Sequence, residues 1–539
     1  MLFDPSKSKA SGATAHRDGG GAFAVEPPAR GVIPRDAVGA EALFGVSRQQ
    51  TNPSRWSGER WGAFTAELRS AGIEVREDRA TKAAFVTDAG GLALGAPHGV
   101  VTARSALHVA AVMKAAQRFR VPVTTRGGGL TTEGETVAFG GLALDMTGMS
   151  KVKHVDREKL LARVEAGIFW HSMAEVLRRQ GLDYISAPLN FTSSVGGTIA
   201  VGGIDVNAAK WGCSADQCVA MEVVTPTGDI VECSESENPQ LFERVLLGYG
   251  QFGVVTEATM RIRPYTPCRM HYLFYDDLRR AIGDLQLVVR SEATDYSGIL
   301  TMKDRANNLL FAFDDDERER AFFANVRPKL RGLTETQFAL RAAAHYALRP
   351  WQLPEALWLY RRKKTLLPEF ERPEHLRDGK LFDRTVVFSR AVWRHWGNRT
   401  MVIPDLAMSA EKFADAVLEG NKVMRKYFKA YTLYCVAIRV FGKRERYELS
   451  CMPPDAEGWG YGCEFEPMFK AGEFSRDYLQ SFKNAIYDVG LKFGGSYYRF
   501  GGAMKGYIRR MFGDELVDRH LAMKRAADPG MVLNPDVVF

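Results

Sequence analysis

The sequence predicts a fold of the α+β class in which one domain is interrupted by another. The chain has 539 residues, more than a single hydrophobic core usually serves. Residues from about 95 to 267 alternate strand and helix patterns and carry clustered glycines, whereas 268–470 carry fewer glycine clusters and more aromatic side chains. Clustered glycine returns at 494–502. We therefore expect the end of the chain to rejoin the first domain.

Composition and charge exclude several classes of protein. Hydrophobic residues make up 46% of the chain and charged residues 25%, which excludes disordered and fibrous proteins. Lys and Arg number 72 against 64 Asp and Glu, so the formal net charge is +8. Spread over this length, the excess argues against a nucleic-acid partner, which needs a concentrated basic face. The densest basic run, at 361–364, is typical of a solvated helix face.

Cysteine usage and the hydropathy pattern bear on the compartment. Seven cysteines, odd in number and widely spaced, predict no disulfide framework. The N-terminal residues lack the apolar segment of a signal peptide, and no stretch approaches the ~18 apolar residues of a membrane span. These patterns predict a reduced, cytoplasmic protein without a membrane span. They leave the oligomeric state open, a homo-oligomer included.

The first elements follow from local patterns. Residues 1–45 are rich in Gly, Pro, Ser and Ala without periodicity, which predicts a flexible or surface-wrapping arm. Residues 55–72 have helical patterning. Ser105 can cap a helix whose apolar positions recur as far as Phe119, and a short apolar strand follows at 121–125.

The same alternation continues to about residue 267. The patterns predict a strand over 160–166, a helix over 170–180, a hairpin over 221–231, a helix capped by Asn238 with Pro239 at its first position, and a strand over 254–262. Charged helical stretches follow at 314–331 and 355–364. We accordingly divide the chain into an arm (1–45), a first domain (46–267, core about 95–267), an inserted domain (268–485) and a C-terminal return (486–539).

The glycine run after the strand at 121–125 is the first candidate binding site. Arg126 is followed by Gly127, Gly128 and Gly129, and the loop extends to Gly134. Successive glycines expose backbone N–H groups that form a concave nest for a phosphate or pyrophosphate. A plain glycine turn is the alternative, but the place of the loop after a parallel-type strand favours the ligand.

Two more glycine motifs need separate interpretations. In 193–198 (SSVGGT), small hydroxyl residues beside glycines let donors reach a ligand closely, although such runs also form β-bulges. Residues 248–253 (GYGQFG) match the G-x-G-x-x-G dinucleotide fingerprint, but here a helix precedes and a strand follows. The fingerprint needs the opposite order, so we reject a Rossmann domain. The scattered histidines predict no metal site.

The order of these motifs resembles the vanillyl-alcohol oxidase/p-cresol methylhydroxylase (PCMH) family of FAD-binding flavoproteins, which includes cytokinin dehydrogenases and sterol side-chain reductases. The resemblance covers about 95–267 and 490–539. It rests on five elements in the family's order: the glycine loop 126–134, SVGGT at 194–198, TPTG at 225–228, GQFGVVT at 250–256, and the closing DP…LNP of 528–535. The middle of the chain matches only by position, where the family has its substrate-binding cap.

The resemblance implies a two-subdomain PCMH-type FAD-binding domain with an inserted antiparallel-sheet substrate cap domain. FAD would lie between the two subdomains. The cofactor-binding residues implied are Arg126, Gly127, Gly128, Gly129, Leu130 and Thr131 at the pyrophosphate, with Ser194, Gly196, Gly197, Thr198, Ile204, Val255 and Asn534 along the rest of the cofactor.

Three departures from the family pattern narrow the chemistry. Leu130 stands where covalent relatives have a flavin-bonding histidine, and Asn190 where berberine-bridge-type relatives have a cysteine. We therefore expect non-covalent FAD. Leu189 stands where cytokinin dehydrogenases have the aspartate that abstracts the substrate proton, so cytokinin oxidation by that mechanism is not expected.

A tyrosine–arginine pair is the predicted catalytic element. Residues 494–499 (GGSYYR) resemble the pair of the vanillyl-alcohol oxidase branch, which assigns Tyr498 to the substrate and Arg499 to the negative charge of reduced flavin. An edge-strand tyrosine with a surface arginine is the alternative. Asp205 and Lys210-Trp211 are second candidates for the front of the flavin.

Together these features predict an FAD-dependent oxidoreductase that takes a hydride from a small organic substrate to flavin N5. Aromatic residues of the inserted domain suggest an apolar or aromatic substrate, although most belong to a core: Trp351, Trp358, Tyr360, Trp393, Trp396, Tyr431 and Tyr434. Two alternatives stay open. One is an NADPH-dependent ene reductase of the sterol-reductase type, which Lys210-Trp211-Gly212 resembles. The other is a flavin-retaining enzyme of redox-neutral cyclisation, or a protein that merely binds a partner.

Overall fold

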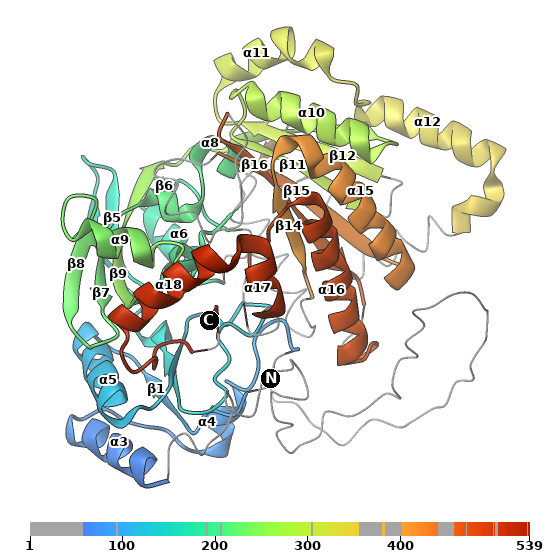
Figure 1. Cartoon of the computed structure of the whole chain (residues 1–539). Helices are drawn as coiled ribbons and strands as arrows, with labels where there is room; N and C mark the ends of the chain where they lie inside the picture. The colour runs from blue at the N-terminus through green and yellow to red at the C-terminus, as the bar shows by residue number, and fades with distance from the viewer. Residues whose placement is uncertain are drawn as a thin grey trace, which may run out of the picture.

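The computed structural model describes residues 58–92, 95–188, 192–204, 207–302, 306–354, 380–382, 402–439, 457–469, 472–499, 501, 505–535 and 537–538. These residues form three β-sheets with helices packed against them (Figure 1). The predicted arm over 1–45 and the helix expected over 355–364 lie outside the described residues. So do Leu189, Asn190 and Asp205.

The first sheet is parallel and three-stranded, in the order β1-β3-β2. Its strands are β1 (Gly99–Thr102), β2 (Val123–Arg126) and β3 (Leu142–Asp145), with helices α3 (Gly58–Ser70), α4 (Arg79–Ala83), α5 (Ala106–Phe119) and η2 (Met146–Gly148) beside it. The predicted cap of α5 is confirmed, because the Ser105 side chain accepts a hydrogen bond from the His108 N–H at 3.3 Å. The apolar side of α5 is buried in a core shared with α3 and the sheet.

The second sheet is antiparallel, in the order β4-β5-β9-β7-β8, with β6 also paired to β9. Its strands are β4 (Val152–Asp156), β5 (Leu161–Glu165), β6 (Leu182–Tyr184), β7 (Cys218–Val224), β8 (Ile230–Ser234) and β9 (Val254–Pro264). Helices α6 (Trp170–Arg178), α7 (Val195–Val201), α8 (Ala208–Trp211), η3 (Ser214–Gln217) and α9 (Pro239–Val245) belong to the same stretch of chain.

The third sheet is antiparallel and seven-stranded, in the order β13-β10-β12-β11-β15-β16-β14. Its strands are β10 (Cys268–Tyr275), β11 (Tyr296–Met302), β12 (Ala306–Phe313), β13 (Lys380–Phe382), β14 (Asp405–Met408), β15 (Tyr431–Arg439) and β16 (Trp459–Pro467). Helices α10 (Leu278–Arg290), α15 (Ala410–Tyr427) and α16 (Arg476–Phe493) cover one face and bury its alternate side chains (Figure 1). The opposite face, here called the inner face, turns toward the second sheet, whose core includes Ala407 and Ile438.

The remaining helices follow β12 and α16 along the chain. Helices α11 (Asp316–Asn325), η4 (Arg327–Lys329), α12 (Glu335–Leu348) and η5 (Pro350–Gln352) follow β12, and α17 (Lys505–Phe512) and α18 (Asp514–Ala527) follow α16. The end of the chain returns to the first sheet, where Leu533 forms a parallel bridge with Val123. Helix α16 runs continuously through the boundary that we set at 485.

Most predicted elements between 55 and 267 are confirmed, and most of their ends lie within one to three residues of the predicted positions. Each of these predictions rests on the periodicity of neighbouring residues. Two details are wrong. Pro239 does begin α9, but the Asn238 side chain makes no cap and donates instead to the Glu232 carbonyl at 2.8 Å. The helical stretch expected over 314–331 is α11 only, since Pro328 follows it in the 3-10 turn η4.

Candidate cofactor and active site

One elongated crevice brings together most of the predicted site residues. Its walls come from the glycine loop, from the start of α7, from the α9–β9 connection and from the C-terminal return. Of the predicted residues, those lining it are Arg126, Gly127, Gly128, Gly129, Leu130, Thr131, Ser194, Gly196, Gly197, Thr198, Val255, Tyr498, Arg499 and Asn534. Ile204 is not among the lining residues and packs between the second-sheet core and the inner face.

The glycine loop has no room for side chains at two of its positions. A Cβ on Gly127 would lie 2.0 Å from the Ser194 Oγ, and one on Gly128 would lie 2.5 Å from the Thr192 carbonyl oxygen. Gly129 has a φ of +65°, in the left-handed region that favours glycine. The loop therefore packs against the start of α7 through glycine backbone atoms. The peptide groups of the loop line the crevice.

Side chains behind the loop hold its shape. The Arg126 guanidinium turns back, donates to the Thr87 carbonyl at 2.8 Å and lies 5.3 Å from the centre of the Phe85 ring. Asp88 accepts from the Thr131 hydroxyl at 2.9 Å and from the Gly134 N–H at 2.8 Å. Burial raises the pKa of Asp88 to about 6, against the opposing effect of these hydrogen bonds.

The hydroxyl groups of the second glycine motif serve the local fold. Ser194 caps α7 by accepting from the Gly197 N–H at 3.3 Å. The Thr198 hydroxyl donates to the Ser194 carbonyl at 2.8 Å and accepts from the Trp170 indole N–H at 2.9 Å. These hydrogen bonds hold the motif against α6. The motif therefore contributes backbone atoms and the shape of the wall to the crevice, and not free hydroxyl groups.

Asn534 ties the end of the chain to the crevice. Its Oδ1 accepts from the Thr125 N–H at 2.8 Å, and its Nδ2 donates to the Gly250 carbonyl at 2.7 Å. The GYGQFG stretch thus links α9 to β9 and packs on Asn534, which confirms that it is not a dinucleotide fingerprint. Buried Lys524 holds the same region through the Gln251 and Leu533 carbonyls at 2.7 and 2.9 Å.

Tyr498 and Arg499 lie where the crevice meets the third sheet. The Gly203 N–H donates to the Tyr498 hydroxyl at 2.6 Å. Arg499 pairs with Glu464 at 2.5 Å and Asp405 at 3.4 Å, and with only 19% of its side chain exposed it is not a surface arginine. Burial opposes its charge, but the two carboxylates outweigh that effect and raise the Arg499 pKa. The positive charge of Arg499 is thus already paired with Glu464 and Asp405 before any ligand binds.

Sequence reasoning missed the carboxyl groups on the inner face of the third sheet. Asp405 on β14 lies opposite Glu464 on β16, and Glu466 shares their face two residues on. Burial raises the pKa of Asp405 to about 7, although Arg499 lowers it. Burial and the Glu464 charge raise the pKa of Glu466 to about 7, and the Thr432 hydroxyl donates to it at 2.7 Å. Both groups can take up or release a proton near neutral pH.

A second acidic cluster lies at the end of the glycine loop. Buried Glu133 pairs with buried Lys483 of α16 at 2.5 Å. Glu135 lines the crevice, is 8% exposed and accepts from the Glu133 N–H at 2.8 Å. Burial and the negative charges of Asp88 and Glu133 raise the Glu135 pKa to about 8. The loop thus adds a carboxyl group to the crevice that is mostly protonated at pH 7.

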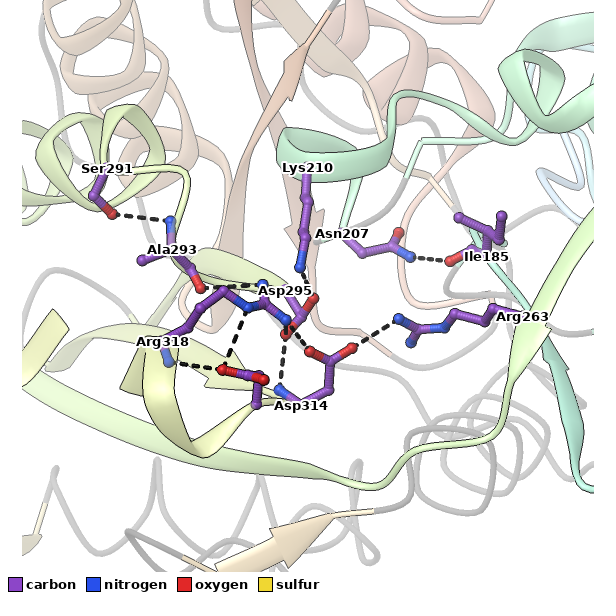
Figure 2. Close-up of polar contacts among 10 residues, drawn as sticks. Ile185, Asn207, Lys210, Arg263, Ser291, Ala293, Asp295, Asp314 and Arg318 are labelled. Atoms are coloured by element: carbon purple, nitrogen blue, oxygen red, sulfur yellow. Dashed lines mark hydrogen bonds and ion pairs between the residues drawn. The ribbon is translucent and has the colours of Figure 1, made fainter. Parts of the chain in front are cut away.

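The second-tier candidate Lys210 has a different role. Figure 2 shows it reaching from α8 to Asp295, where an ion network also includes Asp314, Arg318 and Arg263. Lys210 and Trp211 do not line the crevice, and the Lys210 ammonium lies 5.0 Å from the Trp211 ring centre. The network joins α8 and β9 to the third sheet. Lys210 therefore stabilises the packing of α8 against the third sheet.

Two kinds of feature are absent from the described residues. No group of three or more His, Cys, Asp or Glu side chains there is arranged to hold a metal ion. None of the helices in the described ranges is long and apolar enough to cross a membrane.

Comparisons with known proteins agree with this geometry. Residues 97–234 match a family described as an FAD binding domain. The chain is 32% identical over 174 residues to a D-lactate dehydrogenase from Anaerostipes hadrus, covering 31% of this chain and 37% of that protein. It is 30% identical over 241 residues to cytokinin dehydrogenase 8 from Oryza sativa subsp. indica, covering 41% and 44%. The matched regions thus span less than half the length of these curated relatives.

The fold comparison extends over most of the chain. The structure is similar to that of xylooligosaccharide oxidase from Myceliophthora thermophila C1 in complex with xylobiose, with a TM-score of 0.67 and 14% identity. The match covers 88% of this chain and 99% of that chain. The mixed helix-and-sheet architecture is therefore similar to that of this oxidase over most of the chain, and the match of residues 97–234 to an FAD binding domain indicates FAD as the cofactor of this domain.

Proposed function

Because residues 97–234 are an FAD-binding domain, we propose that the protein is an FAD-dependent oxidoreductase. In this proposal it moves a hydride from a small organic substrate to N5 of non-covalently bound FAD. The observation that carries the proposal is the single crevice in which the glycine loop, the start of α7 and the Tyr498–Arg499 pair meet. The predicted domain division into 46–267, 268–485 and 486–539 remains part of this proposal.

The crevice residues fit the cofactor. The bare backbone of 127–129 suits a pyrophosphate, since a Cβ at Gly127 or Gly128 would collide with its neighbours. We assign Arg126, Leu130 and Thr131 to the same end, with Ser194, Gly196, Gly197, Thr198, Val255 and Asn534 along the remaining wall. Ile204, which lies outside the lining, would act only through packing. Leu130 offers no group that could bond to the flavin, which supports non-covalent attachment.

Residues of this chain would position the substrate and accept its proton. FAD, when bound, supplies the two-electron acceptor. Oxidation of a substrate C–H beside a hydroxyl or amine group releases one hydride and one proton. Asp405 and Glu466 lie on the inner face, outside the crevice lining, and their pKa values of about 7 allow them to hold that proton. Arg499 anchors the pair of strands that carries Asp405 and Glu464. O2 or another external oxidant would take the electrons onward.

The inner face bears on the substrate class. Of the aromatic residues that suggested an apolar or aromatic substrate, Tyr431 is buried in the helix-covered core, Trp351 is 70% exposed, and Tyr434 belongs to the inner face. Trp358, Tyr360, Trp393 and Trp396 lie outside the described residues. Carboxyl groups share the inner face with Tyr434. We therefore propose a small substrate with an apolar or aromatic part and one polar group that bonds to these carboxyls.

Anaerobic titration tests the direction of the reaction. Candidate alcohols, phenols and amines are mixed with the purified protein, and loss of the flavin absorption band is expected with a true substrate. Bleaching by NADPH alone would instead favour the ene reductase, whose sequence support weakens because Lys210 is held by Asp295. Turnover without any bleaching would favour redox-neutral chemistry.

A further inference from the structure

The segment from α12 to η5 exposes an unusual amount of apolar surface. Leu340 is 69% exposed, Leu348 77%, Trp351 70% and Leu353 40%. Among the described residues, eight large hydrophobic side chains are exposed, and half of them fall within this one stretch. Scattered exposed apolar residues need no explanation, but a cluster marks an interaction surface.

The exposed residues form one stripe along a projecting helix. Leu340, Ala344, Leu348 and Trp351 recur at intervals of three or four, so they share one side of α12 and its continuation. The start of the helix is anchored, because the Phe338 ring stacks on the Phe274 ring with 4.8 Å between their centres and Arg341 pairs with Asp276 at 2.7 Å. Beyond this anchor α12 extends away from the third sheet (Figure 1).

Positive charge is concentrated in the same part of the sequence. Residues 327–354 carry five Lys or Arg and one acidic residue. This stretch of the described residues therefore has a formal charge of +4.

We propose that the stripe formed by Leu340, Ala344, Leu348 and Trp351, with the basic residues of 327–354, binds the surface of an anionic lipid bilayer. An apolar stripe with Trp and Leu, bordered by Lys and Arg, is the composition of helices that lie in the membrane interface. Each basic residue near an anionic leaflet adds about 1 kcal/mol of attraction. A projecting helix is convex, and a fluid lipid surface accepts such a shape without a matching groove. The contact is peripheral and involves no membrane span.

Vesicle co-sedimentation of the full FAD-loaded chain tests the proposal. The wild-type protein should bind vesicles of phosphatidylglycerol and phosphatidylcholine, bind phosphatidylcholine alone far more weakly, and release as salt rises above about 0.1 M. The double variant Leu348→Ser/Trp351→Ser should bind the anionic vesicles at least about tenfold more weakly. Lys329→Gln should lower binding by a few-fold and flatten its salt dependence.

The control is Leu107→Ser, which removes an equally exposed leucine (72%) from α5, on a different part of the molecule. It should leave vesicle binding unchanged, and all variants should keep their FAD content. Absence of wild-type binding to anionic vesicles would overturn the proposal. So would light scattering that finds a wild-type dimer which the double variant dissociates, because the stripe would then be a self-association surface. The test is independent of whether the oxidoreductase assignment is right.

Discussion

Glu135 offers a quantitative test of how the crevice recognises its cofactor. Its carboxyl group lines the crevice beside Asp88 and Glu133, while the nearby cation, Lys483, is paired with Glu133. With a pKa of about 8, roughly nine in ten copies are protonated at pH 7. A neutral carboxyl can donate a hydrogen bond to an acceptor on FAD, whereas a carboxylate would repel its phosphates.

The protonation of Glu135 sets the sign and size of a pH effect on FAD binding. If FAD binds the protonated form, its affinity should be level up to about pH 7 and fall about tenfold, or about 1.4 kcal/mol, between pH 7 and 9 as Glu135 ionises. Glu135→Gln keeps a neutral donor, so it should retain affinity at pH 7 and lose the pH dependence. Asp88 ionises near pH 6, below this window.

The assay is titration of the apoprotein with FAD, followed by flavin fluorescence or calorimetry from pH 6 to 9. Glu158→Gln, an exposed residue in the β4–β5 turn, serves as the matched control and should follow the wild type. The reasoning is refuted if Glu135→Gln shows the same loss of affinity above pH 8 as the wild type. It is equally refuted if that variant binds FAD much more weakly at pH 7, because a charged Glu135 would then be what the cofactor needs.

Three further predictions concern other contacts. Lys210→Met should lower the free energy of unfolding by ~3 kcal/mol in denaturant titration, because buried Asp295 loses its closest cation. The control Arg179→Met, at an exposed ion pair, should lower it by under ~1 kcal/mol. Equal effects of the two substitutions would contradict the role of the network. Glu466→Gln should remove an ionisation near pH 7 from the pH–rate profile without abolishing FAD binding, and an unchanged profile would exclude Glu466 as the proton acceptor. Asn534→Ala leaves the Thr125 N–H and the Gly250 carbonyl without their partner, so it should cost ~2 kcal/mol or more and weaken FAD binding, whereas unchanged melting would contradict its structural role.

Local chemistry explains which parts of the fold were predictable. The helix after Ser105, the strand before Gly127 and the start of α9 at Pro239 each follow from neighbouring residues. The rejection of a Rossmann domain at 248–253 also needed only the order of adjacent elements. The glycine motifs could be related to one crevice only through the family resemblance, because no local pattern brings 126–131 next to 194–198.

Other features depend on register between distant strands. Asp405 and Glu464 are 59 residues apart and become neighbours only through the pairing of β14 with β16. Lys210 meets Asp295 because α8 packs against the third sheet, so its sequence neighbours gave a misleading role at the flavin. The exposed stripe on α12 could not be predicted either, because a helical pattern does not show which apolar residues remain exposed to solvent.

The central claim is that the crevice holds FAD without a covalent bond. The most direct measurement is the absorption spectrum of the purified protein before and after acid precipitation. We expect a flavin spectrum in the native protein and recovery of the flavin in the supernatant after precipitation. A colourless protein that takes up no added FAD would contradict the cofactor assignment, and yellow colour remaining in the pellet would contradict non-covalent attachment.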